Sequence, residues 1–314
     1  MIISWIKRNP ITGYLSLFLM SILIILTQGD TEWVDIQFNL LQGIGHFSLP
    51  QWSLLSAFII TLIILLPHFY KTIGLNSKYY HVYSFFVFLG LANPQLNFDV
   101  TNAFGMVFII FAFSKLFATF NESVVKVDLF ETSLWFALAF FMSKEFFLLI
   151  PLMLIGITII RSFKWNEIIN LLLSYILITV GGLTLLYIIS GQFNFVNLLP
   201  FSESNVWKSF SFLPAEIYLL LIGILVLRLM LRSKYLNIKS QQIHNVLFWT
   251  FFTMIAFQFT AWNNYGFYGL LLVSSATSIN NFIKQIKKSW IQDLLFLLVF
   301  ALFFLGDQIT SWLV

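Results

Sequence analysis

Long apolar runs separated by short polar segments dominate this 314-residue chain. A helix needs about 20 apolar residues to cross a hydrocarbon core of about 30 Å, and eleven runs reach or approach that length. They lie at 11–28, 52–69, 80–96, 101–120, 129–142, 146–161, 167–190, 214–231, 244–262, 265–281 and 291–309. The pattern predicts an all-α fold, a polytopic transmembrane helical bundle of about 11 spans. The two shortest runs, 129–142 and 146–161, also fit a re-entrant pair.

The distribution of Lys and Arg orients these spans. When eleven spans are threaded from a cytoplasmic N-terminus, every loop is assigned a side, and basic residues are expected to gather in cytoplasmic loops. Of the 17 Lys and Arg residues, only Lys144 and Lys208 then fall outside. Because one error in the span count would invert every later loop, this asymmetry predicts a cytoplasmic N-terminus and an external C-terminus.

Composition agrees with a lipid environment. Hydrophobic residues make up 59% of the chain and charged residues 10%, whereas soluble domains carry about 25% charged residues. The lipid bilayer is therefore the expected partner of most of the surface. The basic residues are scattered singly, which argues against nucleic acid as a partner. No Pro- or Gly-rich linker divides the chain, so we expect residues 1–314 to form a single integral membrane domain.

The sequence lacks the residues or motifs that several kinds of chemistry require. The chain has no Cys, which excludes disulfides, thiolate nucleophiles and Cys-based metal centres. The four His residues have no metal-ligand spacing. There is no phosphate-binding loop, dinucleotide fingerprint or serine-hydrolase elbow. We therefore predict no metal site, and no motif identifies a cofactor.

Acidic residues are concentrated in the predicted external loops. Asp30, Glu32 and Asp35 crowd the start of the first external loop, and Asp99 lies in the second. Carboxylates at the outer mouth of a helical bundle can bind a divalent cation, act as a general base or simply remain solvated. Apolar residues of the first loop recur at helical spacing, which predicts a short amphipathic helix in the outer interface. They are Val34, Phe38, Leu41 and Ile44.

Lys144 and Glu145 interrupt two strongly apolar segments and put a lysine on the predicted external side. An ion near membrane depth needs a partner or an anion. One interpretation is a site for a lipid phosphate. The other is that the two residues cap two short helices or pair with nearby charges.

The order of these features resembles the GT-C superfamily of polyprenyl-phosphate-dependent membrane glycosyltransferases. The resemblance covers roughly the first 160 residues. The acidic external loop of these enzymes corresponds in this chain to Gly29-Asp30-Thr31-Glu32-Trp33-Val34-Asp35. A later apolar segment with a Ser-Lys pair and a proline corresponds to 139–151, and 91–105 resembles the third and fourth spans of such enzymes. The whole chain also resembles polytopic families of the bacterial inner membrane, which predicts an inner-membrane location.

The resemblance implies a role for each candidate residue. It makes Asp30, Glu32 and Asp35 the candidate catalytic residues, with Asp30 or Asp35 as the base that activates an acceptor. It assigns Lys144, beside Glu145, to the phosphate of a polyprenyl-linked sugar donor. It gives Asp99 an assisting role in binding or orientation.

Two functions follow, and the sequence leaves catalytic activity open between them. The first is transfer of a sugar from a polyprenyl-phosphate donor on the external face of the membrane. The second is a non-catalytic integral membrane subunit of a larger envelope, export or secretion complex, with other membrane-protein subunits as partners. The acidic loop together with Lys144 motivates the first, and short loops, many aromatic residues and the lack of a complete catalytic motif motivate the second.

Overall fold

A computed structural model describes residues 10–28, 33–36, 47–73, 80–91, 99–120, 125–161, 164–190, 238–259, 266, 268–276 and 290. The named helices are α2 (Pro10–Gln28), α3 (Gln51–Thr72), α4 (Tyr80–Leu91), α5 (Val100–Ala118), α6 (Lys126–Met142), α7 (Ile150–Ile160), α8 (Trp165–Ser190) and α10 (Ile238–Phe259). A 3-10 helix, η1 (Lys144–Leu149), joins α6 to α7. Residues 268–276 form a further helical segment.

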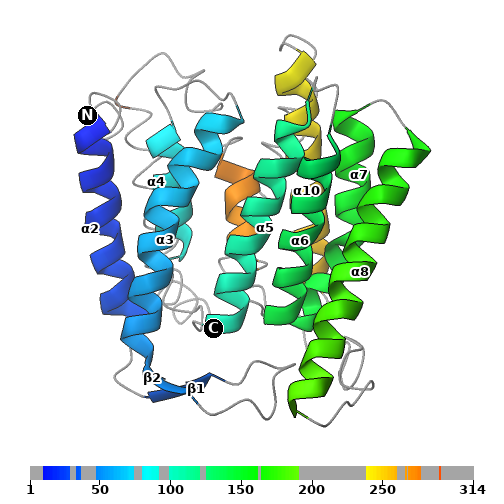
Figure 1. Cartoon of the computed structure of the whole chain (residues 1–314). Helices are drawn as coiled ribbons and strands as arrows, with labels where there is room; N and C mark the ends of the chain where they lie inside the picture. The colour runs from blue at the N-terminus through cyan, green and yellow to red at the C-terminus, as the bar shows by residue number, and fades with distance from the viewer. Residues whose placement is uncertain are drawn as a thin grey trace.

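The helices lie side by side as a bundle (Figure 1). The expectation of a helical membrane protein is confirmed at this level. Within the part of the chain that the structure describes, three helices are long and apolar enough to cross a membrane, judged by length and composition. They are Gln51–Lys71, Val100–Ala118 and Trp165–Leu185. The count of about 11 spans stays a prediction, and the predicted spans 214–231 and 291–309 lie outside the described residues.

One end of the bundle carries a small β-hairpin, which corrects the expected interfacial helix. Strand β1 (Trp33–Ile36) pairs antiparallel with β2 (Phe47–Pro50), and Val34 lies opposite Leu49. Val34 therefore lies in a strand, while Phe38, Leu41 and Ile44 lie outside the described residues. Because β2 leads directly into α3, the hairpin is held at the end of the bundle where α3 begins (Figure 1). We call this end the hairpin end.

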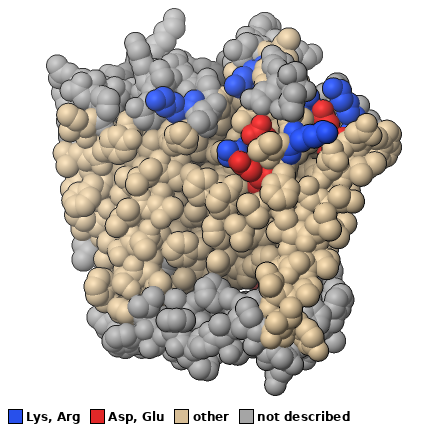
Figure 2. Space-filling model, in the orientation of Figure 1, with Lys and Arg blue, Asp and Glu red and all other residues tan. Residues whose placement is uncertain are grey.

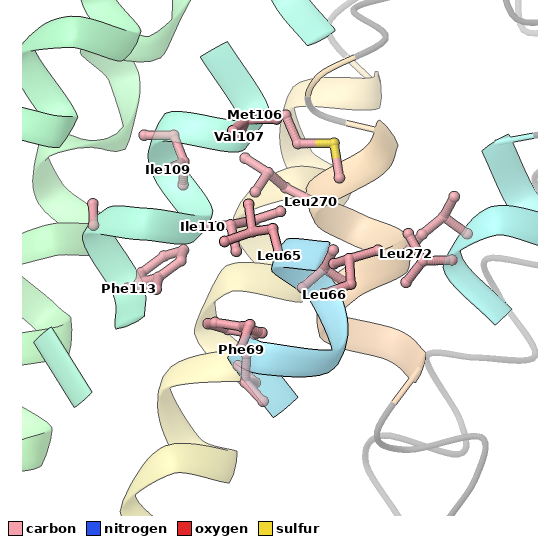
Figure 3. Packing of buried hydrophobic residues seen from close by; sticks show 14 of the residues in the cluster. Leu65, Leu66, Phe69, Met106, Val107, Ile109, Ile110, Phe113, Leu270 and Leu272 are labelled. Atoms are coloured by element: carbon pink, nitrogen blue, oxygen red, sulfur yellow. The ribbon is translucent and has the colours of Figure 1, made fainter. Parts of the chain in front are cut away.

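The core forms where α3, α5 and the segment 268–276 meet. Leu65, Leu66 and Phe69 of α3 pack near Ile110 and Phe113 of α5 (Figure 3). All residues of 268–276 are buried, and in Figure 1 this segment lies in the middle of the bundle. The centre of the bundle is therefore completed by a part of the chain far along the sequence.

Glycines and one hydrogen bond hold the segment 268–276 close to its neighbours. A Cβ at Gly269 would overlap the side chain of Met106 in α5, and a Cβ at Gly90 in α4 would overlap Leu272. The Tyr70 hydroxyl donates a buried hydrogen bond of 2.8 Å to the carbonyl of Val273. Small residues let helix backbones approach closely, which is how helices associate in a membrane.

Helix α8 packs on α6 and shows its other face to the surroundings. Ser133 Oγ of α6 lies 2.8 Å from the Leu171 carbonyl oxygen of α8. Nearer the hairpin end, a Cβ at Gly182 would overlap the ring of Phe141. Only 11% of the apolar, potentially membrane-spanning stretch of α8 is buried inside the protein, whereas 61% of the corresponding stretch of α5 is buried. Helix α8 is therefore a peripheral element.

Candidate functional site

The acidic residues of the first loop are placed only in part. Asp30 and Glu32 lie outside the described residues. Asp35 lies in β1, with its Cα opposite Ser48 of β2. The hairpin thus fixes the backbone of Asp35 at the hairpin end, directly before α3.

Asp99 caps the N-terminus of α5. Its Oδ1 accepts hydrogen bonds from the backbone N–H of Thr101 at 2.9 Å and from the Thr101 hydroxyl at 2.7 Å. Its Oδ2 accepts one from the Asn102 side-chain amide at 2.7 Å. Asp is a preferred N-cap because its carboxylate satisfies free backbone N–H groups and opposes the helix dipole. Asp99 therefore has a structural role, and its position just before an apolar run was a signal for it.

Lys144 and Glu145 lie at the junction between α6 and α7. Helix α6 ends because Ser143 has extended backbone angles, φ −146° and ψ 126°. The chain then turns through η1, and Pro151 lies in the first turn of α7, where a missing backbone N–H costs nothing. Both charged side chains are half-buried.

The buried ring of Phe146 joins this junction to the start of α5. A Cβ at Gly105 of α5 would overlap the ring of Phe146, and a Cβ at Gly266 would overlap both that ring and the carbonyl of Asn102. Asn102 is in turn held by Asp99. The structure therefore brings the Asp99 cap and the junction of Lys144 and Glu145 to one region, at the same end of the bundle as the hairpin (Figure 1).

Charged residues gather at the opposite end of the bundle, which we call the charged end (Figure 2). The Arg161 guanidinium donates to both oxygens of Glu167, with Nε–Oε2 at 2.8 Å and Nη2–Oε1 at 3.1 Å. Its Nη1 also donates to the Thr119 carbonyl at 2.7 Å. Lys115 pairs with Glu131. We name the group of Arg161, Glu167 and the Thr119 carbonyl the arginine clamp.

The arginine clamp was missed by the sequence analysis, which used basic residues only to orient the spans. Arg161 follows α7, Thr119 follows α5 and Glu167 lies in the first turn of α8. The Arg161 and Glu167 side chains are only 10% and 15% exposed. A bidentate Arg–carboxylate pair is among the stronger hydrogen-bonded pairs, so the clamp fixes three helix ends relative to one another. The short spacing from Arg161 to Glu167 was the available signal.

Among the residues that the structure describes, no three His, Asp or Glu side chains lie close enough to hold a metal ion. Asp30, Glu32 and His46 lie outside those residues. The chemistry of the described residues at the hairpin end is therefore that of one lysine and a few carboxylates.

No protein-family model matches the chain, and no curated protein or solved structure is significantly similar to it. The resemblance to the GT-C superfamily thus stays a prediction. The function has to be argued from the residues themselves.

Proposed function

We propose that this protein binds the phosphate of a polyprenyl-linked sugar at the hairpin end and transfers the sugar there, as a GT-C-like membrane glycosyltransferase. One observation carries the proposal. Of the described Lys and Arg residues, only Lys144 lies at the hairpin end, and it has no ion-pair partner among the described residues. A half-buried lysine at a helix junction favours an anion as its partner.

The surroundings of Lys144 fit an amphipathic donor. Below the charged end, the described residues on the face shown in Figure 2 display no charged side chain, which suits a polyprenyl chain. Lys is a compact cation that binds phosphate as a point charge. Asp35 in the hairpin, with Asp30 and Glu32 close to it in sequence, provides the candidate base. In this proposal Asp99 keeps the start of α5 in place beside the junction.

The positive-inside rule supports a side for each end of the bundle. Lys115, Arg161 and Lys164 belong to the charged end through their ion pairs, and Lys239 joins them by lying over the ring of Phe120. Basic residues favour the cytoplasmic side. In the proposal, the charged end faces the cytoplasm and the hairpin end faces outward, in a bacterial inner membrane.

The sidedness can be tested with single cysteines, because the chain has none of its own. Cysteine in place of Lys144 should react with a membrane-impermeant maleimide added outside cells. Cysteine in place of Lys164, which is 57% exposed, should react only after permeabilisation. The reverse pattern would overturn the proposed orientation.

Binding of the donor can be tested with the full chain in nanodiscs and a polyprenyl phosphate as the probe. Lys144→Ala should weaken binding by at least about tenfold, since a charge-assisted hydrogen bond contributes about 1.5–3 kcal/mol. Lys144→Arg should retain most of it. Lys71→Ala, which removes an exposed lysine of α3, is the matched control. Equal binding by all variants would refute the phosphate site.

Catalysis needs a separate measurement. With a polyprenyl-phosphate sugar as donor, Asp35→Asn should abolish transfer or donor hydrolysis while leaving binding unchanged, because an amide accepts no proton. Full activity of Asp35→Asn, with Asp30→Asn and Glu32→Gln also active, would remove the enzymatic proposal.

A non-catalytic subunit is the second candidate, and the exposure of α8 favours it. Exposed apolar residues such as Leu173, Leu177 and Val180 are 54%, 63% and 55% exposed. Such a face suits a helix of a partner as well as lipid. Stoichiometric membrane-protein partners after gentle detergent purification would support this role, whereas a pure monomer with transfer activity would exclude it.

A further inference from the structure

A pocket lies at the charged end between the beginnings of α6 and α8. Its volume is about 610 Å³. Polar residues line much of it: Lys126 from α6, and Lys164, Asn166, Glu167 and Asn170 from the start of α8 and the residue before it. The pocket is thus separate from the hairpin end, and the proposed function makes no use of it.

The described residues that line the pocket carry a net positive charge. Among the described residues that line it, Glu167 is the only carboxylate, and both oxygens of that carboxylate accept hydrogen bonds from Arg161 in the arginine clamp. Lys164 lies 3.7 Å from Glu167 and is 57% exposed, so this contact holds it loosely. Lys126 is exposed and has no ion-pair partner within the described part of the chain. Lys126 at the start of α6 and Lys164 just before α8 therefore remain to meet an anion.

The pocket also has neutral donors and an aromatic edge. The exposed side chains of Asn166 and Asn170 can each donate hydrogen bonds through their amide groups. Trp165 lines the pocket and is 67% exposed. Trp is enriched at membrane interfaces, where one side of the ring is apolar and the other is wet. The pocket is therefore suited to the headgroup level of a bilayer.

An apolar stripe continues from the pocket along α8. Ile169, Leu173, Ile176 and Val180 recur at intervals of three and four residues, so they lie on one helix face. They are 52%, 54%, 56% and 55% exposed. Asn166 precedes this stripe at the same spacing. A cationic pocket at one end of an exposed apolar stripe matches a molecule with an anionic head and long hydrocarbon tails.

We infer that this pocket binds the phosphate headgroup of an anionic phospholipid from the surrounding leaflet, with its acyl chains along the exposed stripe of α8. Lys126 from the start of α6 and Lys164 from just before α8 contact the phosphate, and the Asn166 and Asn170 amides bind the remaining headgroup oxygens. Basic pockets between helices on the cytoplasmic side are typical sites for such headgroups. The bound lipid bridges α6 and α8 beside the arginine clamp.

The test is the thermal unfolding of the full chain in detergent with added phosphatidylglycerol or phosphatidylcholine. Phosphatidylglycerol should raise the Tm more than phosphatidylcholine. The double variant Lys126→Gln/Lys164→Gln should lose more than half of that specific increase. Its matched control is Lys71→Gln/Lys239→Gln, which removes the same charge outside the pocket and should keep the increase. Equal losses in both double variants would show only general surface attraction and would overturn the inference.

A second arm distinguishes a lipid from a soluble phosphate. Glycerol 3-phosphate carries the same anionic group without tails, so at the concentration of phosphatidylglycerol that gives its full effect it should leave the Tm unchanged. A full increase with glycerol 3-phosphate would assign the pocket to a soluble ligand and refute the lipid site. Because all four lysines lie away from the hairpin end, failure of this test would leave the proposed function intact.

Discussion

Helices α5 and α8 are both long and apolar enough to cross a membrane, yet they lie in different surroundings. In α5, 61% of the potentially membrane-spanning stretch is buried in the protein, whereas in α8 only 11% of that stretch is buried. Lipid tails are as apolar as Leu, so hydrophobicity alone does not decide between them. The difference lies in how closely each helix packs. The ring of Phe146 lies directly against Gly105 of α5, whereas the space beside Gly181 of α8 is open.

The largest expected change in stability comes from truncating one large side chain in α5, compared with the same kind of truncation in α8. Phe113 of α5 is 2% exposed and packs in the core, whereas Leu177 of α8 is 63% exposed. Phe113→Ala should lower the free energy of unfolding by about 3–5 kcal/mol because a cavity remains. Leu177→Ala should have little effect, since the tails of the surrounding detergent or lipid fill the space. Thermal unfolding in detergent measures both, and similar losses would contradict the assigned surroundings of α8.

The arginine clamp sharpens the comparison because it joins the end of α5 to the start of α8. Arg161→Ala leaves the 15% exposed Glu167 carboxylate and the Thr119 carbonyl without this donor. We expect a loss of about 1.5–3 kcal/mol, the usual contribution of a hydrogen bond to a charged group. Arg161→Lys should recover only part of it, because Lys has no planar fork.

The control for the clamp is Lys164→Ala, which removes the looser contact to Glu167 at 3.7 Å. Exposed ion pairs contribute about 0–1 kcal/mol, so this change should be small. If Arg161→Ala were no more destabilising than Lys164→Ala, the clamp would not hold α8 in place.

Two adjacent glycines test which face of α8 packs against α6. A Cβ at Gly182 would overlap the ring of Phe141 in α6, whereas nothing lies within 4 Å of a Cβ at Gly181. Gly182→Leu should destabilise the protein by about 1–3 kcal/mol through overpacking. Gly181→Leu should be tolerated. Size-exclusion profiles and unfolding temperatures of the two variants give the answer, and a reversed order would place the wrong face of α8 against α6.

The smallest expected effect concerns the hydrogen bond between α6 and α8. Ser133 Oγ lies within reach of carbonyls of both helices, 3.0 Å from Leu129 O and 2.8 Å from Leu171 O. Ser133→Ala should cost about 0.6 kcal/mol, the average for such bonds in a membrane. The hydroxyl of Thr184 donates a hydrogen bond within α8, to the Val180 carbonyl. Thr184→Val should therefore lower the free energy of unfolding by less than Ser133→Ala. A double-mutant comparison is needed to resolve so small a difference.

Much of the helical pattern could be predicted from hydropathy. The predicted run 11–28 corresponds to α2 (Pro10–Gln28), and 167–190 corresponds to α8 (Trp165–Ser190). Boundaries failed where charged residues continue a helix. The run 129–142 begins at Lys126 in the structure, because charged side chains at a membrane surface remain solvated without ending the helix.

The candidate sites were less predictable because they depend on distant contacts. The cap at Asp99 is local and follows from residue preference. The approach of Gly266 to Asn102 and Phe146 has no local signal, since the residues are far apart in the sequence. Val34 was wrongly expected in a helix, because apolar spacing over so short a stretch does not exclude a hairpin whose partner strand follows a loop.

The hydrogen bond from Tyr70 to Val273 spans 203 positions of the chain, and this separation bears on the order of synthesis. Helices α3, α4 and α5 leave the ribosome long before the segment 268–276 that fills the space among them. Until that segment arrives, the earlier helices lack their central neighbour, and contacts of such sequence separation form late. The nascent protein therefore passes through a stage at which the centre of its bundle is incomplete.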